Sequence, residues 1–242
     1  MSGHSKWNNI KHKKEKADAA KAKIFTKIGK EMAVAIKAGG PDPNNNTKLR
    51  DLIAKAKANN VPNDNIERSI KKASGADGNV NYEVILYEGY GPSGVAIIVE
   101  TSTDNRNRTA GNVRAWFTKY GGNLGQNGCV GYLFEEKGVI TIVDEDEELD
   151  EDKVMEDALE CGAEDIRSDE GEYKIFTEPS DLDSVRDAIV ALGYKIDTAD
   201  IAKVPSTYVE LTSEDDIENM EKMLDKFNED DDVNAVYTNW DN

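Results

Sequence analysis

The side chains that most often serve as catalytic bases, nucleophiles or metal ligands are scarce in this sequence. Among 242 residues there are two His and two Cys. His4 and His12 stand among lysines near the N-terminus, and Cys129 and Cys161 are too far apart to form a Cys-x-x-Cys pair. This pattern argues against both a disulfide framework and a zinc site. We expect a cytoplasmic protein in a reducing compartment, with no metal and no cofactor.

Nothing in the sequence identifies a catalytic group. Cys129 follows a glycine-rich stretch, but a reactive thiolate needs a neighbouring His or cation, and no His lies near it in the sequence. A small buried residue that opens a strand is the favoured interpretation. No acid–base pair stands out among the 48 Asp and Glu residues. We therefore predict that the protein is not an enzyme.

Two further motifs suggest ligands but fit them poorly. Residues 89–94 (GYGPSG) match the spacing of a dinucleotide-binding loop, which needs a helix directly after it. The apolar run Val95–Val99 predicts a strand there instead, so a turn is expected. The acidic run Asp144–Asp152 lacks the glycine and alternating ligands of a calcium loop. It is interpreted as a solvated face leading into a helix.

The N-terminal region carries the clearest binding signal. Residues 13–38 are rich in Ala, lack Pro and end at Gly39-Gly40-Pro41, which predicts a helix. At 100° per residue, six lysines fall within one arc of this helix: Lys13, Lys16, Lys23, Lys27, Lys30 and Lys37. A separate arc is apolar: Ala17, Ile24, Phe25, Ile28, Met32 and Ala35. A row of ammonium groups suits a phosphate backbone, although a merely solvated face is the alternative.

A basic arm precedes this helix and strengthens the interpretation. Residues 1–12 lack periodicity, and an aromatic ring there lies among cations, as stacking on an unpaired base would require. The candidate contacts are Lys6, Trp7, Lys11, Lys13 and Lys14. Trp7 could instead fold back onto the helices.

A second basic cluster, Thr103–Thr109 (TDNRNRT), contains Arg106 and Arg108, and Arg114 follows two turns later. Arginine at a helix N-terminus opposes the helix dipole, so a ligand or a partner acid is expected. Thr103 or Asp104 is predicted to cap this helix. Salt bridges to the acidic body of the protein remain the alternative to nucleic-acid contact.

The charge distribution separates a basic module from an acidic body. The net charge is −18, but residues 1–75 carry 17 basic and 7 acidic side chains, whereas residues 76–242 carry 13 and 41. Such asymmetry indicates contact with nucleic acid or a membrane surface. No apolar run approaches the length of a membrane span and no secretory signal is evident, so no membrane partner is expected.

Periodicity predicts an α+β fold with three domains. Residues 1–78 form the basic arm and a helical domain, with helices at about 47–59 and after a cap at Asn63. Residues 79–134 and 205–242 form a discontinuous α/β middle domain, with a hairpin across GYGPSG and a strand near Val130–Phe134. Residues 135–204 have the β-α-β-β-α-β order of a ferredoxin-like domain inserted into the middle one.

Five segments resemble the YebC/PmpR family, in the family's order and across essentially the whole chain. They are GHSKWNNIKHKK, NVPNDNIERSIKKASG, YEGYGPSG, TDNRNRT and GGNLGQNG. The resemblance implies three domains, with the last inserted in the middle one, and no enzyme activity. It also implies a cytoplasmic, DNA-binding transcriptional regulator, although relatives include a mitochondrial translational activator and factors that relieve ribosomes stalled at proline runs.

Two functional hypotheses follow. The first is a nucleic-acid-binding regulator of gene expression that acts on duplex DNA in transcription. The second is a translation factor that binds ribosomal or transfer RNA, and with it the ribosome, by shape and stacking. The sequence does not separate the two hypotheses. Residues 76–242, with a net charge of −28, would repel phosphate in either case, so that only the arm and the first helix would contact the nucleic acid.

Overall fold

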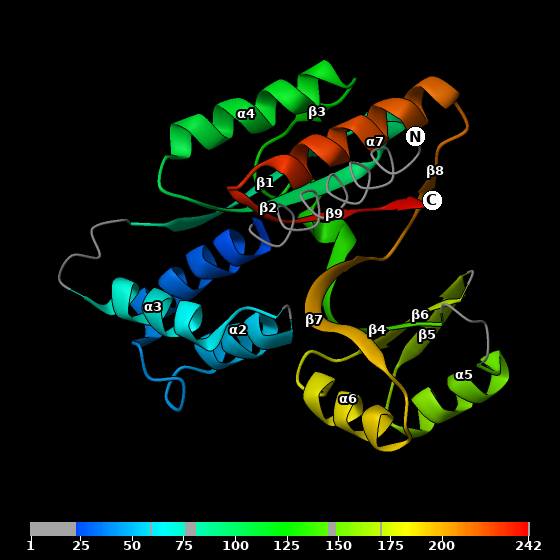
Figure 1. Ribbon diagram of the computed structural model, residues 1–242. Helices are drawn as coiled ribbons and strands as arrows, with labels where there is room; N and C mark the ends of the chain where they lie inside the picture. The colour runs from blue at the N-terminus through cyan, green and yellow to red at the C-terminus, as the bar shows by residue number, and fades with distance from the viewer. Residues whose placement is uncertain (1–22, 59, 76–80, 145–148, 170, 242) are drawn as a thin grey trace, which may run out of the picture. The chain divides into compact units, whose positions relative to one another are not determined.

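The computed structural model describes residues 23–58, 60–75, 81–144, 149–169 and 171–241 (Figure 1). The chain forms two compact units. The first contains residues up to 130 together with 210–238, and the second contains residues 131–209 with 239–241. The second unit is therefore inserted into the first. The predicted fold class, helices followed by two α/β parts with one nested in the other, is confirmed.

The helical part of the first unit consists of a helix over 23–39, α2 (Thr47–Ala58) and α3 (Asn63–Ser74). Their buried apolar side chains form one core: Ile28, Met32, Ala35, Ile36, Leu49, Leu52, Ala56 and Ile66. The first helix ends at Gly40, whose φ of 83° is a conformation that glycine adopts without strain.

One buried amide joins the first helix to α2. Asn46 donates from Nδ2 to the carbonyls of Ala35 and Gly40, and its Oδ1 accepts the backbone N–H of Leu49. The same side chain therefore satisfies the end of the first helix and the start of α2.

The first unit also contains an antiparallel sheet in the order β3-β1-β2-β9. Its strands are β1 (Glu83–Tyr90), β2 (Ala96–Thr103), β3 (Asn123–Leu124) and β9 (Val233–Thr238). The predicted hairpin is confirmed, since β1 pairs with β2 across the short turn η1 (Pro92–Gly94). The late strand β9 pairs with β2, so a strand that begins 150 residues after the start of β1 completes the sheet.

Helices α4 (Arg106–Lys119) and α7 (Glu214–Glu229) lie side by side over this sheet (Figure 1). Phe117 and Phe227 pack with ring centroids 5.3 Å apart, and both are fully buried. Val113, Met220 and Met223 are also fully buried. The two helices, far apart in sequence, therefore share one core and hold the ends of α4 and α7 in fixed positions.

The second unit contains β4 (Phe134–Val143), α5 (Glu151–Glu160), β5 (Asp165–Asp169), β6 (Glu172–Thr177), α6 (Leu182–Ala191) and β7 (Ile196–Pro205). The sheet order is β5-β6-β4-β7, with antiparallel neighbours. This is the predicted β-α-β-β-α-β arrangement. Two short strands, β8 (Val209–Glu210) and β10 (Trp240–Asp241), pair with each other. The exact domain boundaries expected from the sequence stay a prediction.

Three local expectations were wrong. Residues 131–133 form a short 3-10 turn (η2, Gly131–Leu133) instead of a strand. The buried Glu88 explains this, because its carboxylate accepts the backbone N–H groups of Gly128 and Val130 and ties the segment down. Asn63 does not cap α3, since Pro62 occupies the N-cap and no side chain bonds there.

The third error concerns the apolar arc of the first helix. Ile24 is 37% exposed, whereas Ile36, which was not assigned to the arc, is buried. The core therefore lies closer to the C-terminal end of this helix than the spacing predicts.

Candidate nucleic-acid interface

Three lysines of the row predicted on the first helix, Lys23, Lys27 and Lys30, contact the end of α7 and the loop after it. Lys23 donates from Nζ to the carbonyl of Glu229 at 3.1 Å, and Lys27 donates to the carbonyl of Asn228 at 3.2 Å. These are terminal carbonyls of a helix, which carry partial negative charge and attract cations. The spacing i, i+4, i+7 of Lys23, Lys27 and Lys30 places all three amines along the same edge of α7 and its following loop.

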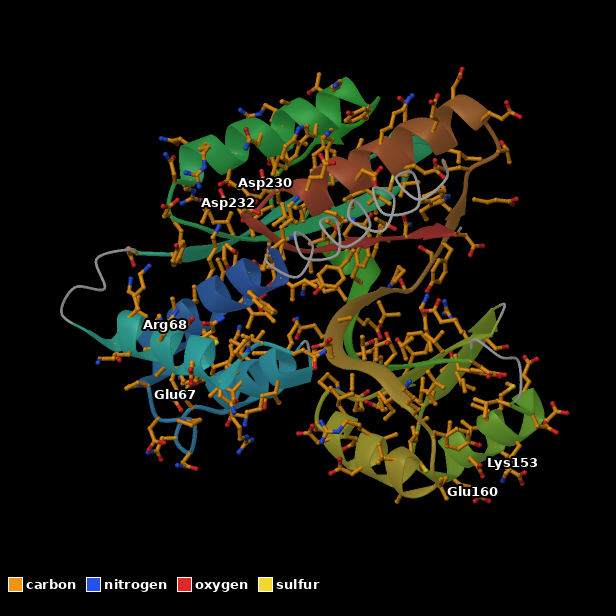
Figure 2. The ribbon with its side chains drawn as sticks, viewed as in Figure 1. Glu67, Arg68, Lys153, Glu160, Asp230 and Asp232 are labelled. Atoms are coloured by element: carbon orange, nitrogen blue, oxygen red, sulfur yellow. The ribbon has the colours of Figure 1, made fainter. Side chains whose placement is uncertain are left out.

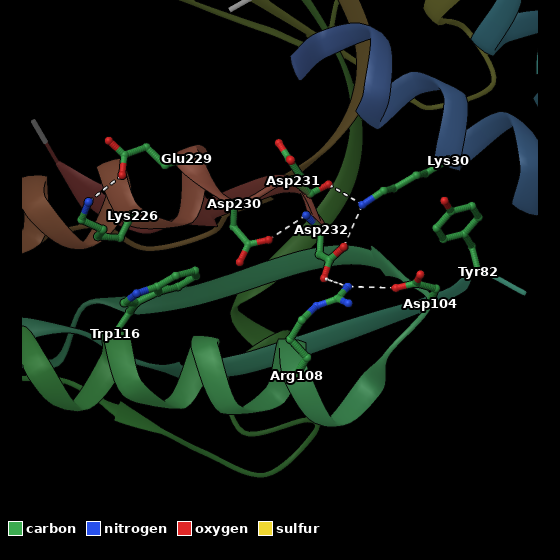
Figure 3. Close-up of a pocket in the computed structure, with 10 residues that line it drawn as sticks. All are labelled: Lys30, Tyr82, Asp104, Arg108, Trp116, Lys226, Glu229, Asp230, Asp231 and Asp232. Atoms are coloured by element: carbon green, nitrogen blue, oxygen red, sulfur yellow. Dashed lines mark hydrogen bonds and ion pairs between the residues drawn. The ribbon is translucent and has the colours of Figure 1, made fainter. Parts of the chain in front are cut away.

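Lys30 reaches further, to the loop between α7 and β9. Its Nζ donates to the carbonyl of Asp231 at 2.9 Å and to Oδ1 of Asp232 at 2.7 Å. The side chains of Lys30 and Asp232 are 12% and 6% exposed, so this ion pair is largely shielded from water. Figure 3 shows Lys30 and Arg108 approaching Asp232 from opposite sides.

Asp232 is the point where the two predicted basic clusters meet. Besides Lys30, its carboxylate accepts from Nη2 of Arg108 at 2.6 Å and from the hydroxyls of Thr109 and Thr103 at 2.8 and 3.3 Å. Burial opposes ionisation of Asp232, but the hydrogen bonds from Lys30, Arg108 and Thr109 outweigh it and lower the pKa to about 2. Asp232 is therefore charged at neutral pH.

The neighbouring aspartates hold the loop in shape. Oδ1 of Asp230 accepts the backbone N–H of Asp232 at 2.7 Å, and Oδ2 accepts from Nδ2 of Asn112 at 3.2 Å. Asp230 and Asp232 lie beside the start of α4 in Figure 2. Burial, followed by the charge of Lys23, lowers the pKa of Lys27, while Asp231 and Asp230 oppose that shift.

A cavity of about 560 Å³ opens beside this loop. Its lining carries five carboxylates and three cations: Asp104, Glu229, Asp230, Asp231 and Asp232 with Lys30, Arg108 and Lys226. Trp116 also lines the cavity and meets Phe227 edge to face, with ring centroids 5.7 Å apart. The excess of carboxylates makes this cavity unsuitable for a phosphate group.

The arginine cluster is divided by the structure. Arg108 bonds to Asp104 at 2.9 Å as well as to Asp232, and these bonds raise its pKa. Arg106 lies 4.0 Å from Glu83, and both side chains are mostly exposed. Arg114 is exposed further along α4. The salt-bridge interpretation thus describes Arg108 and, at the limit of ion-pair distance, Arg106, whereas Arg114 faces solvent.

The predicted cap of α4 was wrong by one or two residues. Asn105 is the N-cap, and its side chain accepts the backbone N–H of Arg108 at 3.1 Å. The hydroxyl of Thr103 accepts the N–H of Asn105 at 2.9 Å and so positions the cap. Thr103 instead donates its hydroxyl to Asp232, and Asp104 accepts from Arg108, which also binds Asp232.

Six of the predicted contacts lie outside the described residues: Lys6, Trp7, Lys11, Lys13, Lys14 and Lys16. Their role in binding nucleic acid stays a prediction, as does that of Lys23, Lys27, Lys30 and the three arginines.

Sequence reasoning missed two features of this region. Arg68, Lys71 and Lys72 are exposed on α3 at spacings of three and four residues, which places them on one face. That spacing in ERSIKK was a readable signal. Asp232 is the second missed feature, because nothing in the run Asp230–Asp232 distinguishes it from its neighbours in the sequence.

The described residues offer little for metal or thiol chemistry. Within them, no group of three or more His, Cys, Asp and Glu side chains is arranged to hold a metal ion. Burial, followed by the charge of Glu88, raises the pKa of the Cys129 thiol, which disfavours a reactive thiolate. In the same part of the chain, no helix is long and apolar enough to cross a membrane.

Family models match nearly the whole chain. Residues 5–76 match the model described as the TACO1/YebC protein N-terminal domain. Residues 82–240 match the model described as the TACO1/YebC second and third domain.

Curated relatives match over their full length. Proteins of Lachnoclostridium phytofermentans and Agathobacter rectalis are 55% and 57% identical over 241 residues, covering 100% of each chain, and both are named probable transcriptional regulatory protein. A crystal structure of a conserved hypothetical protein, Aq1575 from Aquifex aeolicus, is similar with a TM-score of 0.83 and 43% identity. That match covers 93% of this chain and 91% of the other.

Proposed function

Because the chain belongs to the TACO1/YebC family, we propose that it is a nucleic-acid-binding regulator of gene expression that binds duplex DNA in the cytoplasm. The observation that carries the proposal is the excess of positive charge in the first 75 residues, 17 basic against 7 acidic side chains, in a chain whose net charge is −18. The names of the full-length relatives support a role in transcription. The proposed role needs neither catalysis nor a cofactor.

Phosphate contact is assigned first to Lys16, Lys23 and Lys27 of the first helix. The amines of Lys23 and Lys27 bind neutral backbone carbonyls at exposed positions. A phosphate oxygen carries a full charge and is a stronger acceptor, so DNA can replace these carbonyls. Lys30 and Arg108 are held by the buried Asp232 and are assigned a supporting role.

The arm supplies the remaining contacts. Lys6, Lys11, Lys13 and Lys14 would neutralise further phosphates, and Trp7 would stack on a base or insert beside the backbone. The exposed Arg106 and Arg114 of α4 would add further phosphate contacts. Contacts of this type position DNA without reading its sequence.

Salt dependence tests the proposal. Binding of the full-length protein to a labelled DNA duplex is measured by fluorescence anisotropy at several salt concentrations. Each phosphate neutralised contributes about −0.9 to the slope of log K against log salt. Changing Lys16, Lys23 and Lys27 to Gln should therefore reduce the slope by roughly 3, with equal losses on unrelated sequences.

A charge-matched control uses the inserted unit. Changing the exposed Lys153, Lys174 and Lys195 to Gln removes the same charge and should leave the slope unaltered. An unaltered slope in the first variant would show that the lysine row is only solvated. The Trp7→Ala variant provides a second test. A loss on structured RNA with none on duplex DNA would reject the DNA assignment.

A further inference from the structure

A second cavity, of about 740 Å³, lies between the first helix and α3. It is bordered by Phe25, Gly29 and Ala33 on the first helix, Ser69 and Lys72 on α3, and Tyr82 at the start of the β1 segment. This volume falls within the range of small-ligand sites. We call it the helical groove.

The helical groove differs from the acidic cavity beside it in its charge. Its lining includes three lysines, Lys30, Lys37 and Lys72, and none of the described residues that border it is acidic. In a chain with 48 acidic and 30 basic residues, such a lining is unusual and favours an anionic ligand. Tyr82 and Lys30 border both cavities, so the two are adjacent.

Two of the three amines are positioned for a ligand. Lys30 donates from Nζ to Asp231 and Asp232, and its Nζ lies 5.7 Å from the ring centroid of Tyr82. The side chain of Lys30 therefore forms the boundary between the two cavities. Lys37 donates to the side-chain carbonyl of Asn81, a neutral partner that an anion could replace. Lys72 is exposed on the opposite wall. Lys37 and Lys72 therefore offer charge from both sides of the groove.

Two aromatic rings and several neutral polar groups complete the lining. Phe25 and Tyr82 are half-buried, each with part of its side chain accessible. Ser69, Ser74 and Asn81 supply hydroxyl and amide groups that can pair with the edge of a base. Flat rings, polar edges and flanking cations are the combination with which proteins hold unpaired bases.

We propose that the helical groove binds one unpaired nucleotide adjoining the duplex held by the lysine row. This inference rests on the proposed function and adds a structural preference to it. The base enters between Phe25 and Tyr82, and its phosphate contacts Lys37 and Lys72. A paired base cannot enter, because its faces are stacked and its edge is engaged in the duplex. The protein should therefore prefer a duplex with an unpaired end over a blunt one.

The test compares two DNA hairpins with identical stems, one blunt and one with a short unpaired extension. Full-length protein should bind the extended hairpin more tightly. Tyr82→Ala should reduce affinity for the extended hairpin about ten-fold and leave the blunt one unchanged, whereas Tyr82→Phe, which keeps the ring, should behave as wild type. Lys72→Gln should weaken only the extended hairpin. Lys48→Gln, on the exposed surface of α2 away from the groove, is the control.

Photo-crosslinking gives a readout that does not depend on a variant. A 5-bromodeoxyuridine at the unpaired position should crosslink to the peptide containing Phe25 or that containing Tyr82. Equal affinity for the two hairpins, an equal effect of Tyr82→Ala on both, or crosslinks confined to other peptides would overturn the groove assignment while leaving duplex binding intact. Absence of binding to either hairpin would overturn the proposed function and this inference together.

Discussion

The ammonium group of Lys30 lies 2.7 Å from a carboxylate oxygen of Asp232, 202 residues further along the chain. The other oxygen of the same carboxylate accepts from Arg108 at 2.6 Å. Two basic clusters that are separate in sequence thus converge on one acid. This arrangement joins the first helix to the sheet and its helices, and it limits the cations available to DNA to those that bind neutral carbonyls or face solvent.

Neutralising Asp232 should destabilise the protein. Asp232→Asn leaves Lys30 without its shielded counter-charge and places an amide donor against three donors, so the free energy of unfolding should fall by about 3 kcal/mol. Urea denaturation measures this. Asp231→Asn is the matched control, because Asp231 contributes its backbone carbonyl to Lys30 and exposes its side chain. Its effect should stay within about 0.5 kcal/mol. Equal effects of the two substitutions would contradict the assignment.

The same carboxylate should make stability depend on pH. Its pKa is lowered from 3.8 to about 2 by its hydrogen bonds to Lys30, Arg108 and Thr109, against the opposing effect of burial. A group with a depressed folded pKa contributes stability that is present above the unfolded pKa and is lost as pH falls through the folded one. The gap in unfolding free energy between wild type and Asp232→Asn should therefore be constant above about pH 5 and shrink towards pH 2. If the difference in unfolding free energy stayed constant from pH 5 to pH 2, the pH dependence of stability could not come from Asp232.

The fold was largely predictable because its elements follow local rules. The period of two in residues 82–88 and 95–101 predicted the hairpin, and the helical spacing of Val113 and Phe117 predicted α4. The failures arose where a distant side chain decides. Val130 precedes a turn because the carboxylate of Glu88, on β1, accepts its backbone N–H. No local pattern contains that information.

The candidate interface was less predictable for the same reason. The helical wheel placed Lys23, Lys27 and Lys30 on one face, and the structure does align their amines. What the wheel cannot reveal is that this face meets the end of α7, because that contact joins positions about 200 residues apart. The position of Arg108 at the N-terminus of a helix, where it opposes the helix dipole, predicted an acidic partner. The sequence did not identify that partner as Asp232.

The anchoring role of Glu88 leads to a third prediction. Glu88 is buried and accepts two backbone N–H groups, at 2.8 Å from Gly128 and 3.0 Å from Val130. Glu88→Ala leaves both donors without this acceptor, at about 1–3 kcal/mol each when buried. The free energy of unfolding should fall by about 3 kcal/mol, and hydrogen exchange should accelerate at residues 128–130. Glu83→Ala, exposed on the same strand, should change neither quantity. Unchanged exchange at residues 128–130 in Glu88→Ala would reject the anchor.

The last prediction concerns the nesting of the two units. The core of the inserted unit consists entirely of its own side chains, including Ile140, Ile142, Val154, Ile175 and Ile189. A fragment of residues 131–209 should therefore fold alone and melt cooperatively, as seen by circular dichroism and calorimetry.

The matched fragment is residues 81–130, which carries β1, β2 and α4 but lacks α7 and β9. Its β2 loses the partner strand β9, and Phe117 loses Phe227, so it should remain unfolded. Joining residues 81–130 to 210–241 through a short linker should restore a cooperative transition, because β9 and α7 return to the same core. A stably folded 81–130 fragment, or an unfolded 131–209 fragment, would contradict the insertion of one independently folding unit into the other.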